Sequence, residues 1–122
     1  MSREHHARLE LLVAAALTAP DPEAAFRRAA EDDSLPEESR AALRAADARG
    51  IRVAALLVTR LRFERLLRGS DESGTWFERD PAGFTAAFRR YHHAVPPTAF
   101  SPRAEAALFE SWLDAEGTSP RG

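Results

Sequence analysis

Apolar side chains recur every three or four residues along most of the chain, the spacing that gives a helix one buried face. The first such stripe contains Leu9, Leu12, Val13, Ala16 and Leu17. Ser2 is a residue type that caps helix N-termini and Pro20 cannot continue a helix, so we expect the first helix between them. No segment alternates apolar and polar residues for more than a few positions. We therefore predict no β-sheet.

Capping signals mark where later helices begin. Three pairs place a capping side chain directly before a proline, which suits the first turn of a helix: Asp21-Pro22, Asp80-Pro81 and Ser101-Pro102. Ser34 and Glu37 match a capping box, and Gly50 is the expected C-terminal stop of that helix. Together these signals predict six or seven short helices.

The segment 51–68 is expected to be the central helix. Its residues from Val53 to Val58 are apolar on every side, which is typical of a helix enclosed by others. Gly69 should end it, and the polar residues 70–74 should form a loop. The predicted fold is thus all-α, a compact bundle of six or seven short helices around a central buried helix at about 51–68.

Length and composition indicate one globular domain. The chain has 122 residues, of which 44% are hydrophobic and 30% charged, an ordinary balance for a folded domain. We expect a single helical domain over 1–117 and a disordered tail over 118–122. The longest apolar run is shorter than the roughly 20 residues of a membrane span, and the absence of cysteine fits a reducing compartment. A cytoplasmic protein without membrane contact is expected.

Two aromatic helices meet at an elbow, residues 95–100, with the sequence VPPTAF. The aromatic residues on either side have helical spacing and should pack mainly on one another, although a peptide groove is the alternative. Pro96 and Pro97 should keep the chain extended so that Phe100 can tuck back toward the core. Tyr91 and His92 end their helix just before the elbow, and we expect one of them to reach the surface.

The arginines of the central helix form a basic segment. Arg52, Arg60, Arg62, Arg65 and Arg68 are accompanied by a single acid, Glu64. They could bind nucleic acid, or they could be a solvated face paired with nearby acids. A formal net charge of −2 and the absence of lysine argue against nucleic acid. The residues expected to bind a protein partner are Tyr91, His92, Pro96, Pro97, Phe100, Arg62, Arg65 and Arg68.

Catalytic and metal-binding motifs are missing from the sequence. The histidines occur as adjacent pairs, His5-His6 and His92-His93, and neighbours in a helix point about 100° apart. No pair has the i, i+4 spacing of a helical metal motif. There is no Gly-rich phosphate loop, nucleophile elbow or thiol. We therefore expect no enzyme activity, no catalytic residue, no metal site and no cofactor.

Residues 50–113 resemble a known family. The segments GIRVAALLVTRLRFERLL, WFERDPAGFTAAFRRYHHAVPPTAF and EAALFESWL are similar to the helical N-terminal domain of bacterial proteins often labelled DNA-binding. Members are encoded beside multinuclear non-heme iron-dependent oxidative enzymes that modify ribosomal peptides, and act as their accessory partners. The 122 residues contain no counterpart of the second domain of longer members, which is similar to a peptide-recognition element.

The resemblance implies an accessory subunit in RiPP biosynthesis. Its partners would be an iron-dependent oxidative enzyme and the peptide substrate of that enzyme, with enzyme docking as the role that transfers best. The iron would belong to the enzyme. On the residues and the resemblance together, we expect a non-catalytic protein–protein interaction module. The alternative is a small DNA-associated regulator that uses the arginines of the central helix.

Overall fold

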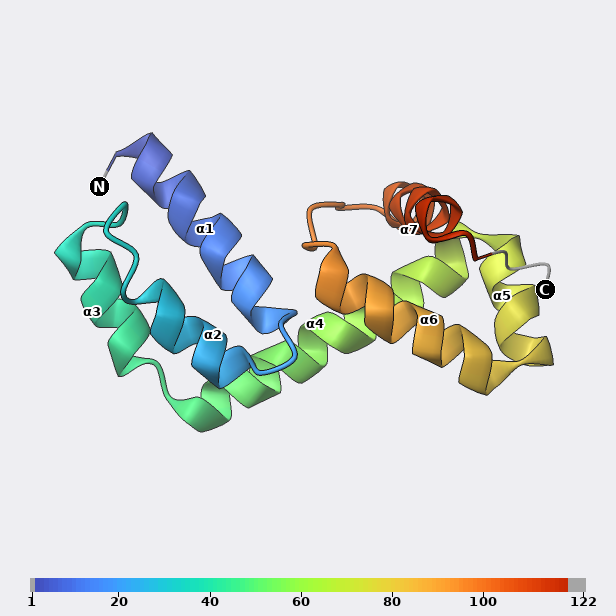
Figure 1. The fold of residues 1–122 in the computed structure, drawn as a ribbon, viewed down its shortest axis with the longest axis horizontal. Coiled ribbons are helices and arrows are strands. Elements are labelled where there is room, and N and C mark those ends of the chain that lie inside the picture. The colour runs from blue at the N-terminus through green and yellow to red at the C-terminus, as the bar shows by residue number, and fades with distance from the viewer. Residues whose placement is uncertain (1, 119–122) are drawn as a thin grey trace. The chain divides into compact units, whose positions relative to one another are not determined.

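The computed structural model describes residues 2–118, and these contain seven α-helices and no strand (Figure 1). The all-α prediction is therefore confirmed. The helices are α1 (Arg3–Leu17), α2 (Pro22–Ala29), α3 (Glu37–Ala45), α4 (Ala48–Gly69), α5 (Asp71–Arg79), α6 (Pro81–Ala94) and α7 (Pro102–Glu116). No helix among the described residues has the length and apolar character that a membrane span needs.

The chain divides within α4 into two compact units, residues 1–58 and 59–122. One continuous helix belongs to both units, and the single domain over 1–117 stays a prediction. Of the predicted tail, residues 119–122 lie outside the described part of the chain. Thr118 still donates its backbone N–H to the Leu113 carbonyl at 2.9 Å, next to the left-handed Gly117 that ends α7.

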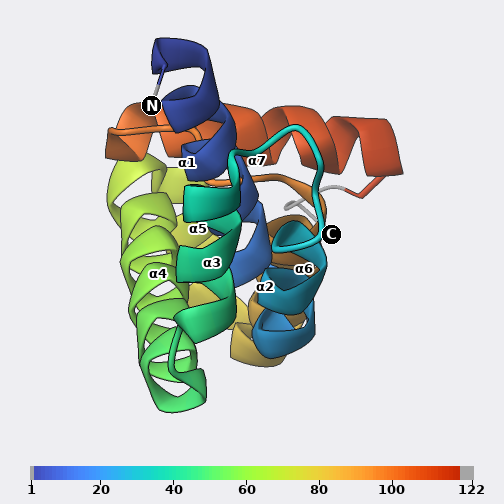
Figure 2. The same ribbon diagram turned by 90° about the vertical axis from the view of Figure 1, so that its left-hand side faces the viewer.

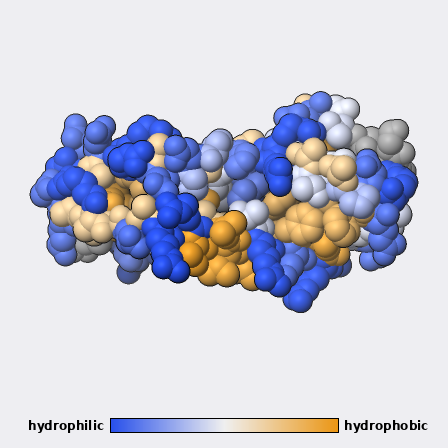
Figure 3. Space-filling view, turned by 90° about the horizontal axis from the view of Figure 1, so that it is seen from below, coloured by the Kyte–Doolittle hydropathy of each residue, from blue (hydrophilic) through white to orange (hydrophobic). Residues whose placement is uncertain are grey.

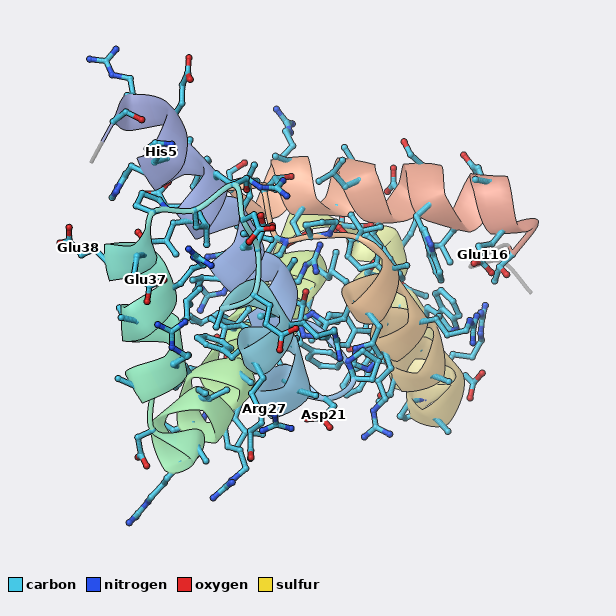
Figure 4. All side chains as sticks on the ribbon, turned by 60° about the vertical axis from the view of Figure 1, so that its left-hand side comes forward. His5, Asp21, Arg27, Glu37, Glu38 and Glu116 are labelled. Atoms are coloured by element: carbon cyan, nitrogen blue, oxygen red, sulfur yellow. The ribbon has the colours of Figure 1, made fainter. Side chains whose placement is uncertain are left out.

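The first unit is a small helical core in which α2 packs against both α1 and α3 (Figures 1 and 2). Its buried residues are Ala16, Ala25, Phe26, Ala29, Ala30, Leu35, Leu43 and Ile51. Half of them are alanines, which let helix backbones approach closely. The polar side chains of His5, Glu37 and Glu38 are exposed, outside this core (Figure 4).

The second unit is built on aromatic packing. Its buried cluster consists of Leu66, Trp76, Phe84, Ala87, Phe88, Tyr91, Phe109 and Leu113. Phe84 is fully buried and meets Phe63, Trp76 and Phe109 edge to face, with ring centroids 5.4–5.9 Å apart. Such edge contacts are the favoured geometry of aromatic pairs. The prediction that the aromatic residues pack mainly on one another is confirmed.

Most predicted helix starts are confirmed. The side chains of Ser2, Asp21, Asp80 and Ser101 each accept a hydrogen bond of 3.1 Å from the backbone N–H three residues on. Local chemistry suffices for these caps, because a Ser or Asp before the first turn satisfies one of its unpaired N–H groups.

Three local expectations are wrong. Helix α3 has Pro36 at its N-cap without any side-chain bond, because Ser34 instead bonds to Asp32. Gly50 lies inside α4, not at the end of α3. The expected loop at 70–74 is the start of α5, which Ser70 caps by accepting a hydrogen bond from the Ser73 N–H at 3.2 Å.

The apolar run of α4 is not enclosed, contrary to expectation. Val53, Leu56 and Leu57 are 50%, 70% and 55% exposed, and apolar side chains are visible on the surface in Figure 3. Of the α4 residues in the first unit, all of them described, only Ile51 is buried. Ile51 is the α4 residue that joins the buried cluster of the first unit, and hydrophobic periodicity does not state how many faces of a helix are covered. The buried α4 residues of the second unit are Arg62 and Leu66.

Phe109→Ala should lower the free energy of unfolding of the second unit by roughly 3–5 kcal/mol, because it empties space among stacked rings. Leu108→Ala, one residue away and 37% exposed, is the matched control and should change it by about 0.5 kcal/mol or less. Both tryptophans, Trp76 and Trp112, lie in the second unit. Urea denaturation followed by tryptophan fluorescence therefore measures this unit, and equal effects of the two variants would contradict the aromatic core.

Candidate functional site

The second unit contains a buried ion pair between α4 and α7. Arg62 and Glu105 are both fully buried, and Arg62 Nε donates to Glu105 Oε1 at 3.0 Å. Arg62 lies one turn before Leu66 and Glu105 one turn before Phe109, so helical periodicity turns both charged side chains toward the core. Removing two charges from water is costly, and only close pairing with further hydrogen bonds compensates for it.

Tyr91 of α6 completes the pairing of Glu105. Its hydroxyl donates to the second carboxylate oxygen, Oε2, and its ring lies under the Arg62 guanidinium with 4.5 Å between Cζ and the ring centroid. Burial, followed by the hydrogen bond to Glu105, raises the pKa of Tyr91 well above its usual range. The phenol is therefore a fixed hydrogen-bond donor at neutral pH.

The remaining donors of Arg62 bind backbone carbonyls at the end of α6 and in the elbow. Nη1 donates to the Val95 carbonyl at 2.6 Å and lies 3.5 Å from that of His92, while Nη2 donates to the Pro96 carbonyl at 3.3 Å. Carbonyls at a helix C-terminus have no partners within the helix, and a cation there is favoured by the helix dipole. Arg62 therefore fixes both the end of α6 and the start of the elbow.

His92 is buried beside this network, with 3% of its surface exposed. Its ring stacks on Phe88 at 5.3 Å, its Nε2 lies 3.1 Å from Thr59 Oγ1, and its Nδ1 lies 3.4 Å from Arg62 Nη1. Burial and the charge of Arg62 lower the pKa of His92 to about 4. The imidazole is thus neutral at physiological pH. It does not repel the Arg62 guanidinium, and its Nδ1 can accept a hydrogen bond from Arg62 Nη1.

The outer side of the elbow exposes a large apolar side chain. Phe100 is 95% exposed, whereas its neighbour Ala99 is buried. The expectation that Phe100 tucks back is therefore wrong. Ala99 packs against the core while the next side chain, Phe100, faces solvent. Pro96 is exposed as well, and Pro97 is half-buried.

The predicted binding residues fall into two groups. Arg62, Tyr91 and His92 are brought together with the Pro96 carbonyl, but all three side chains are buried. The expectation that Tyr91 or His92 reaches the surface is wrong, because both lie on the buried face of α6. Arg68 is exposed and Arg65 is half-buried.

Glu105 is the central residue that sequence reasoning missed. It stands at an inward position of α7, in register with Phe109 and Trp112, as Arg62 stands in register with Leu66 on α4. Two opposite charges on the apolar stripes of different helices are a signal of a buried pair. Among the described residues, no group of three or more His, Asp or Glu side chains is placed to hold a metal ion.

Comparisons with known proteins assign neither a family nor a function to the chain. No protein-family model matches the chain, and neither a curated protein nor a solved structure matches it.

Separate removal of the two buried charges should be strongly destabilising. Arg62→Met and Glu105→Gln should each lower the free energy of unfolding by about 3–5 kcal/mol, because each leaves buried polar groups without their partner. The double variant should lose less than the two single losses combined. Urea denaturation by tryptophan fluorescence measures all four proteins, and strictly additive losses would show that the pair is not coupled.

The stability of the second unit should fall as the pH is lowered from about 6.5 toward about 4. In this window His92 takes up a proton in the unfolded chain, where its pKa is near 6.5, but not in the folded chain, where burial lowers it to about 4. Because the unfolded state binds more protons than the folded state in this window, the free energy of unfolding decreases as the pH falls. The expected loss is on the order of 2–3 kcal/mol.

His92→Gln is the control for this titration, since it keeps a polar group but cannot be protonated. Denaturation curves recorded across the window should be flatter for this variant than for the parent protein. Equal pH dependence of the two would show that His92 is not the group responsible.

Proposed function

We propose that the chain is a non-catalytic protein–protein interaction module that docks through its elbow, residues 95–100. The observation that carries the proposal is that Phe100 is 95% exposed on a loop whose first carbonyls, those of Val95 and Pro96, bind Arg62. An exposed aromatic side chain on an already ordered loop loses little conformational entropy when it binds. Aromatic residues, phenylalanine included, are also enriched at the centres of protein interfaces.

The elbow is ordered by groups of the core. Within it, Thr98 donates its N–H to the Pro96 carbonyl at 3.0 Å, and the Val95 N–H returns to the Tyr91 carbonyl at 2.8 Å. Pro96 and Pro97 have no N–H and restrict the backbone further. The carbonyls of Val95 and Pro96 then depend on Arg62. A loop fixed in this way can present Phe100 without first rearranging.

The resemblance of residues 50–113 suggests the class of partner. We propose that this partner is an iron-dependent oxidative enzyme that modifies ribosomally made peptides, with the chain as its accessory subunit in the cytoplasm. The metal chemistry would then belong to the enzyme. The buried network supports a structural role, because its hydrogen-bonding groups bind one another and the elbow backbone.

The DNA-associated regulator is less well supported. Of the arginines on which it depends, Arg62 is fully buried and Arg60 pairs with Glu64 at 3.3 Å. We expect duplex DNA binding to be weak, independent of sequence and lost as salt rises, since only exposed cations would release counterions. Sequence-dependent binding that persists at physiological salt in an electrophoretic shift assay would favour the regulator.

Phe100→Ala should weaken capture of the partner at least about thirtyfold, the equivalent of about 2 kcal/mol at an interface centre. Its melting temperature should hardly move, because the side chain contributes nothing to the core. The first partner to test is an iron-dependent enzyme encoded beside this protein, by co-purification and then biolayer interferometry.

Leu56→Ala is the matched control, because Leu56 is 70% exposed but lies on α4 in the first unit. It should bind like the parent protein. A reversed pattern, with Leu56→Ala impaired and Phe100→Ala normal, would move the docking surface from the elbow to α4.

A further inference from the structure

The elbow returns along the last two turns of α4. At its start, the Val95 and Pro96 carbonyls bind Arg62. At its end, the backbone of α7 presses on Gly69, where an added Cβ would lie 2.0 Å from the Pro102 oxygen and 3.1 Å from the Arg103 nitrogen. Only glycine permits this approach. Helix α4 therefore meets the chain at both ends of the elbow, at Arg62 and at Gly69, and Arg65 and Arg68 lie on α4 between these two contacts.

Arginines outnumber acids on the chain at either end of the elbow, and Glu64, the acid on this stretch of α4, pairs with Arg60 at 3.3 Å. Arg68 and Arg103 are exposed and Arg65 is half-buried, and in the described part of the chain none of the three forms an ion pair. Residues 92–104 contain no acid, and the next one, Glu105, is buried with both oxygens bound. Asp71 and Glu72 follow Gly69 but occupy the first turn of α5, where the helix N-terminus favours them.

On the basis of the docking surface proposed above, we infer that the partner binds the elbow with an acidic segment that also supplies an apolar pocket for Phe100. Arg65, Arg68 and Arg103 form no ion pair with an acid among the described residues. Their charges therefore complement Asp and Glu side chains of a partner. Opposite charges around an apolar centre also accelerate association at low salt.

Single-stranded nucleic acid is the competing ligand, because an exposed aromatic ring among arginines can also stack on a base. Such binding usually relies on several aromatic side chains along a basic groove. The elbow exposes one ring, Phe100. The acidic protein segment is therefore the better fit.

A selection experiment tests the inference without a known partner. Short random peptides are displayed on phage and selected on the full chain at physiological salt, with Phe100→Ala used for counter-selection. The expected result is a set of peptides rich in Asp and Glu next to large apolar residues. Neutral or basic peptides whose binding requires Phe100 would overturn the inference of an acidic partner segment and leave the proposed docking site intact. A failure to enrich peptides that depend on Phe100 would overturn both.

Charge reversal then tests the arginines with the strongest selected peptide. Arg68→Glu and Arg103→Glu should each weaken its binding on the order of tenfold in fluorescence anisotropy and reduce its dependence on salt. The matched control is Arg27→Glu, since Arg27 lies exposed on α2 in the first unit (Figure 4). It makes the same change in net charge and should bind like the parent protein. Equal weakening by all three variants would overturn a local role for the elbow arginines.

Labelled oligothymidine is the nucleic-acid arm of the same assay. The inference expects weak binding that is lost at physiological salt. Tight binding of oligothymidine that requires Phe100 and persists at that salt would overturn the acidic segment in favour of single-stranded nucleic acid.

Discussion

The Arg62 guanidinium is a full positive charge without exposure to solvent, and the second unit is arranged around satisfying it. Glu105 supplies the opposite charge, Tyr91 supplies a ring face, and the last carbonyls of α6 and the elbow accept the remaining donors. An arginine buried without these partners would cost several kcal/mol. The position of α6, the course of the elbow and the first turn of α7 are consequently tied to one side chain.

This arrangement joins the hydrophobic core to the surface. The elbow has two prolines and few backbone hydrogen bonds of its own, so its conformation is determined largely by contacts with the interior. Phe100 contributes little to stability but has its position set by residues that contribute a great deal. Stability and binding should therefore separate at Phe100 and stay coupled at Arg62. This difference would distinguish the proposed docking side chain, Phe100, from the buried residues that hold the elbow.

The features that the sequence predicted correctly are local ones. Four N-caps and the helical class follow from neighbouring residues, and the aromatic spacing of α6 and α7 identified a shared core. The errors concern which faces are covered. An all-apolar run around Leu56 gives no information on the number of neighbouring helices, and the direction of Phe100 depends on where Ala99 packs. Arg62 was expected among the partner-binding residues at the surface, because its buried partner, Glu105, is 43 residues away and local patterns do not reveal it.

The same distinction explains how a chain of net negative charge can expose unpaired arginines near the elbow, the proposed docking surface. Several arginines elsewhere are neutralised in pairs: Arg52 lies 2.5 Å from Glu23, Arg8 lies 3.1 Å from Asp32, and Arg40 lies 3.1 Å from Glu37. Glu64, which precedes Arg65 on α4, pairs with Arg60, and Glu105 is occupied by Arg62 and Tyr91. Because screening limits exposed charges to about 8–10 Å, an approaching segment responds to Arg68 and Arg103 and not to the net charge. Local pairing, which composition does not reveal, therefore determines which charges remain unpaired near the elbow.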